Sequence, residues 1–227
     1  MNLALFDLDH TLIPFDSGLA WLSFLAEQGA LPGAAAADYL GCAQRVTRGQ
    51  ADIAALHRAL MLPLASLPWP ALLSWRAAFG EAIAAALPPA RRALVQRHQA
   101  DGDLCVLVTA TARVVAEPFA ALFGMAHLIA TESATVDGAP AGRWSGETLG
   151  PPCHGVHKRD RVVAWLAAAP PAAGAPTTLA GFARSWFYSD AASDLPLLAA
   201  VTDPVAVRPD AALRDHAQRA GWPVIAD

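Results

Sequence analysis

An apolar run and two acidic residues share one stretch of the sequence, Leu3-Ala4-Leu5-Phe6-Asp7-Leu8-Asp9-His10-Thr11-Leu12. The run has the length of a strand, and Asp7 and Asp9 follow where it ends. Because residues i and i+2 of a strand point to the same face, both carboxylates should leave the strand together. Two interpretations are open: a polar turn, or a carboxylate pair that binds a divalent cation, since charges are costly to bury without a partner.

Composition narrows the class of protein. The chain has 227 residues, of which 55% are hydrophobic and 16% charged, which suits one sizeable core and a small accessory domain. A net charge of −4 without a basic run argues against a nucleic-acid partner. The N-terminus does not resemble a signal peptide, and no apolar stretch is long and uncharged enough to span a bilayer. The three cysteines fit a reducing cytoplasm better than a disulfide framework.

The order of expected elements indicates an α/β protein with a helical insertion. Apolar positions at helical spacing predict helices over residues 19–28, 32–48, 51–62 and 69–86. After Pro88, helices alternate with short apolar runs, which is typical of a doubly wound parallel sheet. We expect strands over 104–108, 127–130, 186–188, 204–207 and 224–225, and helices over 89–100, 114–123, 158–168, 195–200 and 210–220.

Two connections stand out in the second half of the chain. Asp137-Gly138 is a hairpin signal within residues 135–146. The Pro/Ala/Gly-rich segment from residue 169 to Thr178 predicts a flexible connection.

Acidic residues also follow the predicted strand over 186–188, at Asp190 and Asp194. In a parallel sheet they would meet Asp7 and Asp9 at the carboxyl edge, where ligands of such sheets bind. Carboxylates suit Mg²⁺, which prefers oxygen ligands and keeps waters or a substrate phosphate in its shell. A turn and a helix cap are the simpler explanation for Asp190 and Asp194.

Two further positions complement these carboxylates. Thr109, at the end of the predicted strand over 104–108, offers a hydroxyl and the backbone N–H groups around Ala110 to phosphate oxygens. Lys158 offers a compact positive charge that could hold a nucleophile and a phosphate together. One carboxylate could attack phosphorus, and the other could protonate the leaving oxygen and then activate water. Singly, Thr109 is explained as a strand end and Lys158 as a solvated helix start, but their order favours a site.

These motifs resemble those of the haloacid dehalogenase superfamily. The four matching segments, in chain order, are Asp7-Leu8-Asp9-His10-Thr11-Leu12, Val108-Thr109-Ala110-Thr111, Lys158, and Tyr188-Ser189-Asp190-Ala191-Ala192-Ser193-Asp194-Leu195-Pro196-Leu197-Leu198. With Val205-Ala206-Val207-Arg208-Pro209-Asp210 and Gly221-Trp222-Pro223, the pattern is similar to the subfamily IB hydrolases, near phosphoserine phosphatase. The resemblance implies a Rossmann-like core of residues 1–15 and 87–227 and an inserted type 1 cap of residues 16–86.

The resemblance implies a role for each matching residue. Asp7 would be the nucleophile and a Mg²⁺ ligand, and Asp9 the general acid/base with its backbone carbonyl on the metal. The remaining implied roles are metal ligand for Asp190, support of the metal shell for Asp194, and phosphoryl binding for Thr109, Ala110 and Lys158. Asp9 favours a phosphomonoesterase, because the dehalogenases lack an acidic residue there and the transport ATPases carry threonine.

The chain also departs from the phosphoserine phosphatase pattern. His10 stands where those enzymes usually have serine, and Asp16 lies near the glutamate with which they contact the substrate amine. Asp16 could bind a cation or cap the first inserted helix. Arg45 and Arg48 could meet a substrate carboxylate or belong to a solvated helix face. Trp21 could shape the substrate pocket or belong to the cap core.

Cys153-His154-x-x-His157 offers three zinc-ligand types, but its spacing matches no usual structural zinc pattern, so an incidental loop is the preferred interpretation. His157 could still touch a phosphate. We expect a cytoplasmic, Mg²⁺-dependent phosphomonoester hydrolase for a small phosphorylated metabolite such as phosphoserine or histidinol phosphate. The alternatives are a non-catalytic phosphometabolite-binding or regulatory protein and a phosphotransferase.

Overall fold

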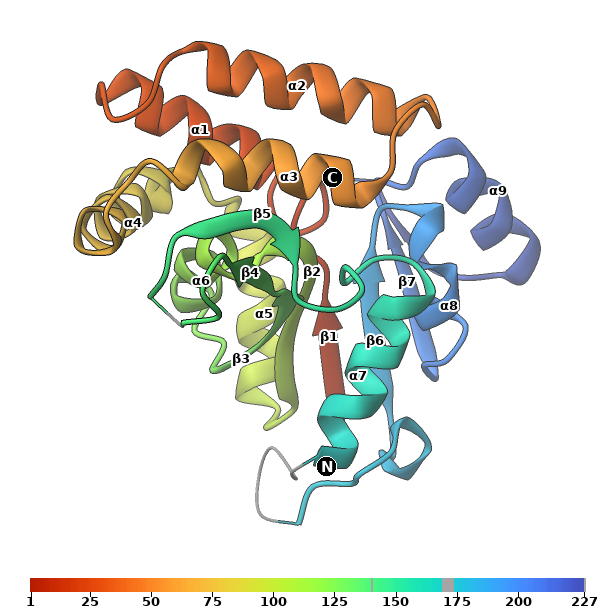
Figure 1. The fold of residues 1–227 in the computed structure, drawn as a ribbon. Coiled ribbons are helices and arrows are strands. Elements are labelled where there is room, and N and C mark those ends of the chain that lie inside the picture. The colour runs from red at the N-terminus through yellow and green to blue at the C-terminus, as the bar shows by residue number, and fades with distance from the viewer. Residues whose placement is uncertain (140, 169–173, 227) are drawn as a thin grey trace.

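The computed structural model describes residues 1–139, 141–168 and 174–226 (Figure 1). Its main sheet has the strand order β3-β2-β1-β6-β7-β8, and every neighbouring pair is parallel. The strands are β1 (Leu3–Phe6), β2 (Leu104–Ala112), β3 (His127–Thr131), β6 (Ser185–Ser189), β7 (Asp203–Val207) and β8 (Val224–Ile225). This topology confirms the predicted α/β fold with a doubly wound parallel sheet.

Strand β1 is buried on both faces, as its unbroken apolar run predicted. Leu3 and Leu5 belong to a hydrophobic cluster with α7 (Val156–Ala168), α8 (Leu195–Leu198) and α9 (Ala211–Ala220). Ala4 and Phe6 belong to a second cluster with α5 (Pro89–Ala100) and α6 (Arg113–Leu122). Alternate side chains of one strand therefore pack against two helical layers. The carboxyl end of the strand is left facing the inserted helices.

The inserted helices follow β1 directly. They are α1 (Ser17–Glu27), α2 (Ala34–Thr47), α3 (Ile53–Leu64) and α4 (Trp69–Ile83), followed by the 3₁₀ turn η1 (Ala84–Ala86). Asp16 and Asp52 cap α1 and α3, each accepting a hydrogen bond from a backbone N–H at 2.8 Å. In Figure 1, α2 and α3 lie across the carboxyl end of the sheet. The division into core and cap domains at residues 16 and 86 stays a prediction.

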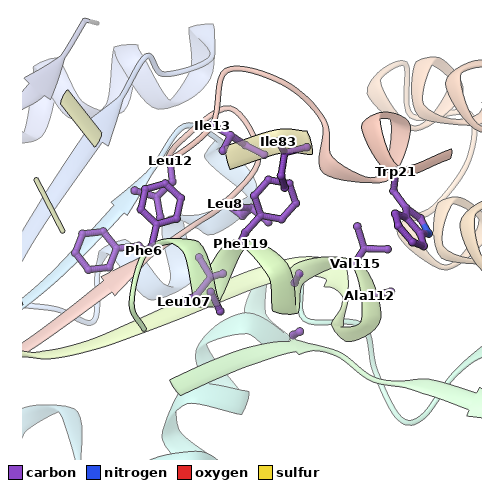
Figure 2. Close-up of a cluster of buried hydrophobic side chains, with 14 of the residues drawn as sticks. Phe6, Leu8, Leu12, Ile13, Trp21, Ile83, Leu107, Ala112, Val115 and Phe119 are labelled. Atoms are coloured by element: carbon purple, nitrogen blue, oxygen red, sulfur yellow. The ribbon is translucent and has the colours of Figure 1, made fainter. Parts of the chain in front are cut away.

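The inserted helices and the sheet share one hydrophobic cluster (Figure 2). Phe119 of α6 lies 5.9 Å, between ring centroids, from Phe79 of α4. Phe79 in turn contacts Trp21 of α1 at 5.0 Å in an edge-on arrangement. Aromatic pairs with this geometry add to the free energy of simple area burial. The inserted helices are thereby fixed over the sheet.

A second, two-stranded sheet also contacts the inserted helices. Strands β4 (Ser133–Thr135) and β5 (Trp144–Thr148) are antiparallel, and Gly138 between them has φ +70°, as the predicted Asp-Gly turn requires. Helix α3 approaches β5 so closely that a Cβ on Gly146 would lie 2.8 Å from Leu62. Arg58 of α3 also pairs with Glu147 of β5, with Nη2 2.8 Å from Oε1. The hairpin therefore sets the position of α3.

Some element ends differ from the sequence prediction. Strand β2 continues past Val108 to Ala112, because its pairing with β3 resumes after an irregularity and the Thr131 hydroxyl donates to the carbonyl of Ala110 at 2.7 Å. Helix α8 ends at Leu198 instead of residue 200. The remaining 3₁₀ turns are η2 (Leu179–Gly181) and η3 (Ala192–Asp194). Residue 140 of the expected hairpin and residues 169–173 of the expected connection lie outside the described residues.

None of the helices in the described ranges combines the length and apolar character needed to cross a bilayer.

Candidate active site

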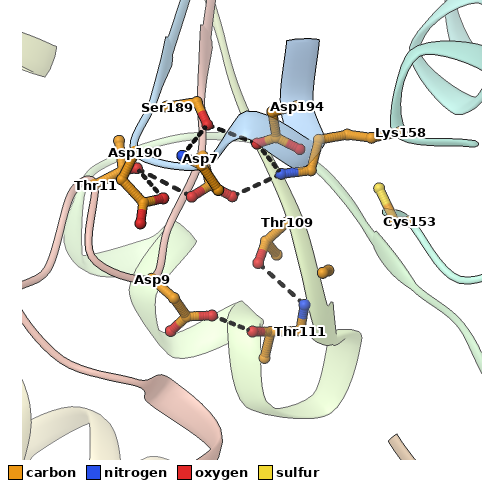
Figure 3. A network of polar contacts seen from close by, with 12 residues as sticks. Asp7, Asp9, Thr11, Thr109, Thr111, Cys153, Lys158, Ser189, Asp190 and Asp194 are labelled. Atoms are coloured by element: carbon orange, nitrogen blue, oxygen red, sulfur yellow. Dashed lines mark hydrogen bonds and ion pairs between the residues drawn. The ribbon is translucent and has the colours of Figure 1, made fainter. Parts of the chain in front are cut away.

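Lys158 is the centre of a buried charge network at the carboxyl edge of the sheet (Figure 3). It lies in the first turn of α7, and its Nζ is 2.8 Å from Asp7 Oδ1 and 2.6 Å from Asp194 Oδ2. Burial alone would lower the pKa of Lys158, but the carboxylates of Asp194 and Asp7 raise it above its ordinary value. The amine is therefore held protonated between two carboxylates.

Asp190 joins the network through Thr11. The Thr11 hydroxyl lies 3.0 Å from Asp7 Oδ2 and 3.2 Å from Asp190 Oδ1, so these two carboxylate oxygens are close to each other. Burial, and after it the charge of Asp7, raises the pKa of Asp190 to about 8. Burial also raises the pKa of Asp7, against the opposing effect of Lys158. A further cation beside Asp7 and Asp190 would stabilise both ionised carboxylates.

The donor set fits Mg²⁺ better than zinc. Within residues 1–139, 141–168 and 174–226, no group of three or more His, Cys, Asp or Glu side chains is arranged to hold a metal ion, and Cys153, His154 and His157 form no such group. Mg²⁺ needs fewer protein ligands, because it is commonly bound by one or two carboxylates together with waters and substrate phosphate. Asp7 and Asp190 supply such a pair, and buried Asp194 Oδ1 has no hydrogen-bond partner among the described residues.

Asp9 lies apart from this network and points the other way. Its Oδ2 accepts a hydrogen bond from Thr111 at 2.6 Å (Figure 3). Its Oδ1 accepts one from the backbone N–H of Ser17, also at 2.6 Å. Burial, with a contribution from the negative charge of Asp16, raises the pKa of Asp9 to about 7. A carboxyl group that titrates near neutral pH can both give and accept a proton during a reaction.

The two predicted phosphate-binding residues on β2 are placed differently. Thr109 is fully buried, and its hydroxyl oxygen accepts a hydrogen bond from the backbone N–H of Thr111 at 3.1 Å. Ala110 lines a cavity next to Asp9. Thr109 thus stabilises the end of β2, between the Lys158 network and Asp9 in Figure 3.

The loop after β1 is held in an unusual conformation. His10 has φ +58°, in the left-handed region that non-glycine residues rarely adopt. Arg208, which follows β7 and has φ +44°, donates from Nη2 to the carbonyls of His10 at 2.6 Å and Ile13 at 3.2 Å. Such local strain persists where surrounding contacts enforce it. Arg208 therefore fixes the backbone that carries Asp9.

A cavity of about 110 Å³ lies between the inserted helices and the end of β2. It is lined by Asp9, Asp16, Tyr39, Ile53, Leu56, His57, Leu60, Ala110, Thr111, Ala112 and Pro152. A larger cavity of about 630 Å³ lies between α4, α6 and the hairpin, but contains none of the predicted site residues. The smaller cavity is therefore the one that adjoins Asp9.

Only one of the four candidate specificity residues reaches this cavity. Asp16 lines it, caps α1 through Leu19 N, and accepts a hydrogen bond from Tyr39 at 3.0 Å. Trp21 is fully buried among aromatic side chains of α1 and α4. Arg45 lies on an exposed part of α2, and Arg48 is exposed directly after the end of that helix. Apart from Asp16, the residues that line the cavity are therefore not among the predicted specificity residues.

Sequence reasoning missed several residues of the site. Thr11 and Thr111 lie within the quoted motifs, but the sequence analysis assigns them no role. In the structure the Thr11 hydroxyl donates to Asp7, and the Thr111 hydroxyl donates to Asp9. Ser189 was also passed over, and its hydroxyl donates to Asp194 Oδ2 at 2.7 Å. Tyr39 and His57, on α2 and α3, carry no motif signal. Only the packing of the inserted helices brings them to the cavity.

Comparison with known proteins agrees with this geometry. The family model of haloacid dehalogenase-like hydrolases matches residues 4–199. Over 226 residues the chain is 36% identical to a histidinol-phosphatase from Neisseria meningitidis, covering 99% of this chain and 98% of that one. A solved structure of a protein of unknown function from Bordetella pertussis matches with a TM-score of 0.87 at 40% identity, covering 99% of this chain and 97% of that one.

A substrate-bound phosphoserine phosphatase structure matches with a TM-score of 0.63, covering 99% of this chain and 92% of that one. At 16% identity this likeness shows the fold alone. The family match over most of the chain, together with a relative aligned over nearly its whole length, is decisive. The chain belongs to the haloacid dehalogenase-like hydrolase family, within which it is a phosphatase.

Proposed function

We propose that the protein is a Mg²⁺-dependent phosphomonoester hydrolase in which Asp7 attacks phosphorus and forms an aspartyl-phosphate. The observation that carries this proposal is the buried contact of Lys158 Nζ with Asp7 Oδ1 at 2.8 Å. The ammonium group favours the ionised form of the nucleophile. It is also positioned to neutralise charge on a phosphoryl group bound at Asp7. Electrostatic stabilisation of this kind contributes much of the rate enhancement in such reactions.

Asp9 supplies the proton transfers. As the Asp7 oxygen bonds to phosphorus, the bond from phosphorus to the leaving oxygen breaks, and Asp9 gives that oxygen its proton. Asp9 then accepts a proton from a water molecule that attacks phosphorus and releases phosphate from Asp7. Thr111 and the Ser17 N–H, each at 2.6 Å, hold the Asp9 carboxyl in position for both steps.

The metal would be held by carboxylate oxygens of Asp7 and Asp190 and by the backbone carbonyl of Asp9. When bound, Mg²⁺ supplies positive charge that stabilises the phosphoryl oxygens. Asp194 supports this arrangement through its contact with Lys158, at 2.6 Å.

Two candidate substrates follow from the relatives. The relative aligned over the whole chain is named a histidinol-phosphatase, so histidinol phosphate is the first candidate. Phosphoserine is the second, because a phosphoserine phosphatase shares the fold. We also propose the cytoplasm as the location, since the three cysteines are unpaired and buried, as a reducing compartment allows.

The test is phosphate release from histidinol phosphate, phosphoserine, a sugar phosphate and 4-nitrophenyl phosphate, each with Mg²⁺ or with EDTA. We expect release that needs the metal and disappears in Asp7→Asn, while the thermal unfolding of that variant stays cooperative. Wild-type turnover by Asp7→Asn would refute the nucleophile assignment. Binding without release would favour a regulatory protein, and phosphate transfer to an added alcohol would favour a phosphotransferase.

A further inference from the structure

His57 presents a buried polar atom that the described structure does not satisfy. The residue is 5% exposed, and its Nε2 has no hydrogen-bond partner among the described residues. Buried side-chain nitrogen atoms normally have a protein or water partner. His57 also lines the cavity of about 110 Å³ that Asp9 adjoins. The missing partner therefore has space beside the proposed reaction site.

The position of His57 is fixed by the contact between α3 and the hairpin. The neighbouring residue, Arg58, holds Glu147 with two nitrogen atoms, Nε at 3.0 Å and Nη2 at 2.8 Å. Leu62, further along α3, packs on Gly146. With the helix anchored to the hairpin at Arg58 and Leu62, the imidazole has a defined place in the wall.

The ring is neutral at physiological pH and can accept a hydrogen bond. Burial lowers the pKa of His57 to about 4, although the backbone of Glu147 opposes this by favouring a ring proton. A neutral imidazole has one N–H donor and one acceptor nitrogen. Because the backbone of Glu147 accounts for the donor, the unpartnered Nε2 is left as the acceptor.

The other polar groups of the cavity likewise offer hydrogen-bond acceptors, not donors, to a ligand. Asp9 and Asp16 contribute carboxylate oxygens, which accept hydrogen bonds. The hydroxyl donors of Tyr39 and Thr111 are already directed to those carboxylates. The residues that line the cavity in the described structure include neither lysine nor arginine, and the rest of the wall is apolar. A complementary ligand must therefore bring its own donors.

We propose that His57 is a specificity-determining residue that accepts a hydrogen bond through Nε2 from an N–H group on the leaving alcohol of the substrate. The substrate class is the phosphate esters of nitrogen-bearing alcohols. The inference rests on the proposed function, because it assigns the cavity beside Asp9 to the leaving group. It also gives a reason for a histidine inside an otherwise apolar face of α3.

The test compares matched esters and matched variants. Ethanolamine phosphate carries an ammonium donor, and propyl phosphate replaces it with a methyl group of similar size; histidinol phosphate and 4-nitrophenyl phosphate complete the set. His57→Leu removes the acceptor at similar volume, and His57→Gln restores a polar group. His127→Leu makes the same chemical change at the start of β3, at the amino ends of the strands and away from the cavity, and is the control.

We expect His57→Leu to lower kcat/KM for the nitrogen-bearing esters about tenfold or more, mainly through KM, as loss of one buried hydrogen bond predicts. Propyl and 4-nitrophenyl phosphate should change less than about twofold, and His57→Gln should recover part of the loss. An equal loss for all four esters, or no loss for any, would overturn the proposal.

Failure of the proposed function has a different signature. If wild-type protein releases no phosphate even from 4-nitrophenyl phosphate, the hydrolase assignment fails. The cavity is then tested by thermal shift with histidinol, which should stabilise wild-type protein and His127→Leu more than His57→Leu. Equal shifts for the three proteins would overturn the assignment of His57.

Discussion

Arg208 donates a hydrogen bond to the carbonyl of His10 at 2.6 Å, across 198 positions of sequence, and both residues have a positive φ. Each end of this contact lies in a backbone conformation that is unfavourable for a residue with a side chain. The hydrogen bond ties the segment after β7 to the loop between Asp9 and α1.

Replacing Arg208 with alanine should release this loop. We expect the free energy of unfolding to fall by about 1–3 kcal/mol, because two carbonyls lose a charged donor. The kcat should fall as well, since Asp9 is anchored by the same loop. Urea denaturation and 4-nitrophenyl phosphate turnover measure the two effects. Arg184→Ala breaks an exposed pair with Asp203 and should leave both the midpoint of urea unfolding and kcat nearly unchanged.

Lys158 should be irreplaceable by an uncharged residue of similar length. In Lys158→Met the buried carboxylates of Asp7 and Asp194 would face each other without a cation. Removing one partner from a buried ion pair costs about 3–5 kcal/mol, so the midpoint of urea unfolding should fall clearly. Added Mg²⁺ should restore part of the stability. A variant as stable as wild-type protein would show that the network does not hold the two carboxylates together.

Asp9→Asn should slow the reaction according to the leaving group. General acid–base help is worth about 10²–10⁴-fold, so kcat for an alkyl phosphate such as propyl phosphate should fall within that range. The loss for 4-nitrophenyl phosphate should be smaller, because nitrophenolate leaves without a proton. Thr111→Val, which removes the 2.6 Å hydrogen bond to Asp9, should show the same pattern more weakly. Equal losses for both esters would argue against Asp9 as the proton donor.

His57 should make the wild-type protein sensitive to mild acid. Burial lowers its folded-state pKa to about 4, while the charges of Glu147 and Arg58 act in opposite directions. Between the unfolded value of about 6.5 and about 4, the unfolded chain binds more protons, so stability is lost as the pH falls through this window. The contribution is at most about 3 kcal/mol.

Urea denaturation at pH 7, 5.5 and 4 checks this directly. The difference in unfolding free energy between wild-type protein and His57→Leu should shrink as the pH falls. His127→Leu is measured alongside as the control for the chemical change. A constant difference between wild-type protein and His57→Leu would mean that the ring takes up its proton over the same pH range in the folded and unfolded states, so that folding does not lower its pKa.

The sheet edge was predictable from sequence because parallel topology determines it. Once Asp7 and Asp190 end strands of one parallel sheet, they must lie at one edge, and the structure brings Lys158 to the same edge. The end of β2 was harder, because Thr131 extends the pairing beyond the apolar run.

The wall of the cavity was not predictable in the same way. Helical spacing tells which side chains share a face, but not which face meets the sheet and which meets solvent. Arg45 and His57 are both polar residues on inserted helices, yet one is exposed and the other buried. The difference comes from the hairpin, whose contact with α3 sets the orientation of that helix.

Lys158 is the only lysine in the 227 residues of the chain, and it is 2% exposed. Within these residues an amine-reactive reagent therefore has one side-chain target, and that side chain is hidden in the site. Peptide mass spectrometry would find a label on Lys158 only in molecules that have opened around Asp7. The rate of that label reports how often the site opens, without an engineered probe, and its dependence on added phosphate ester reports occupancy.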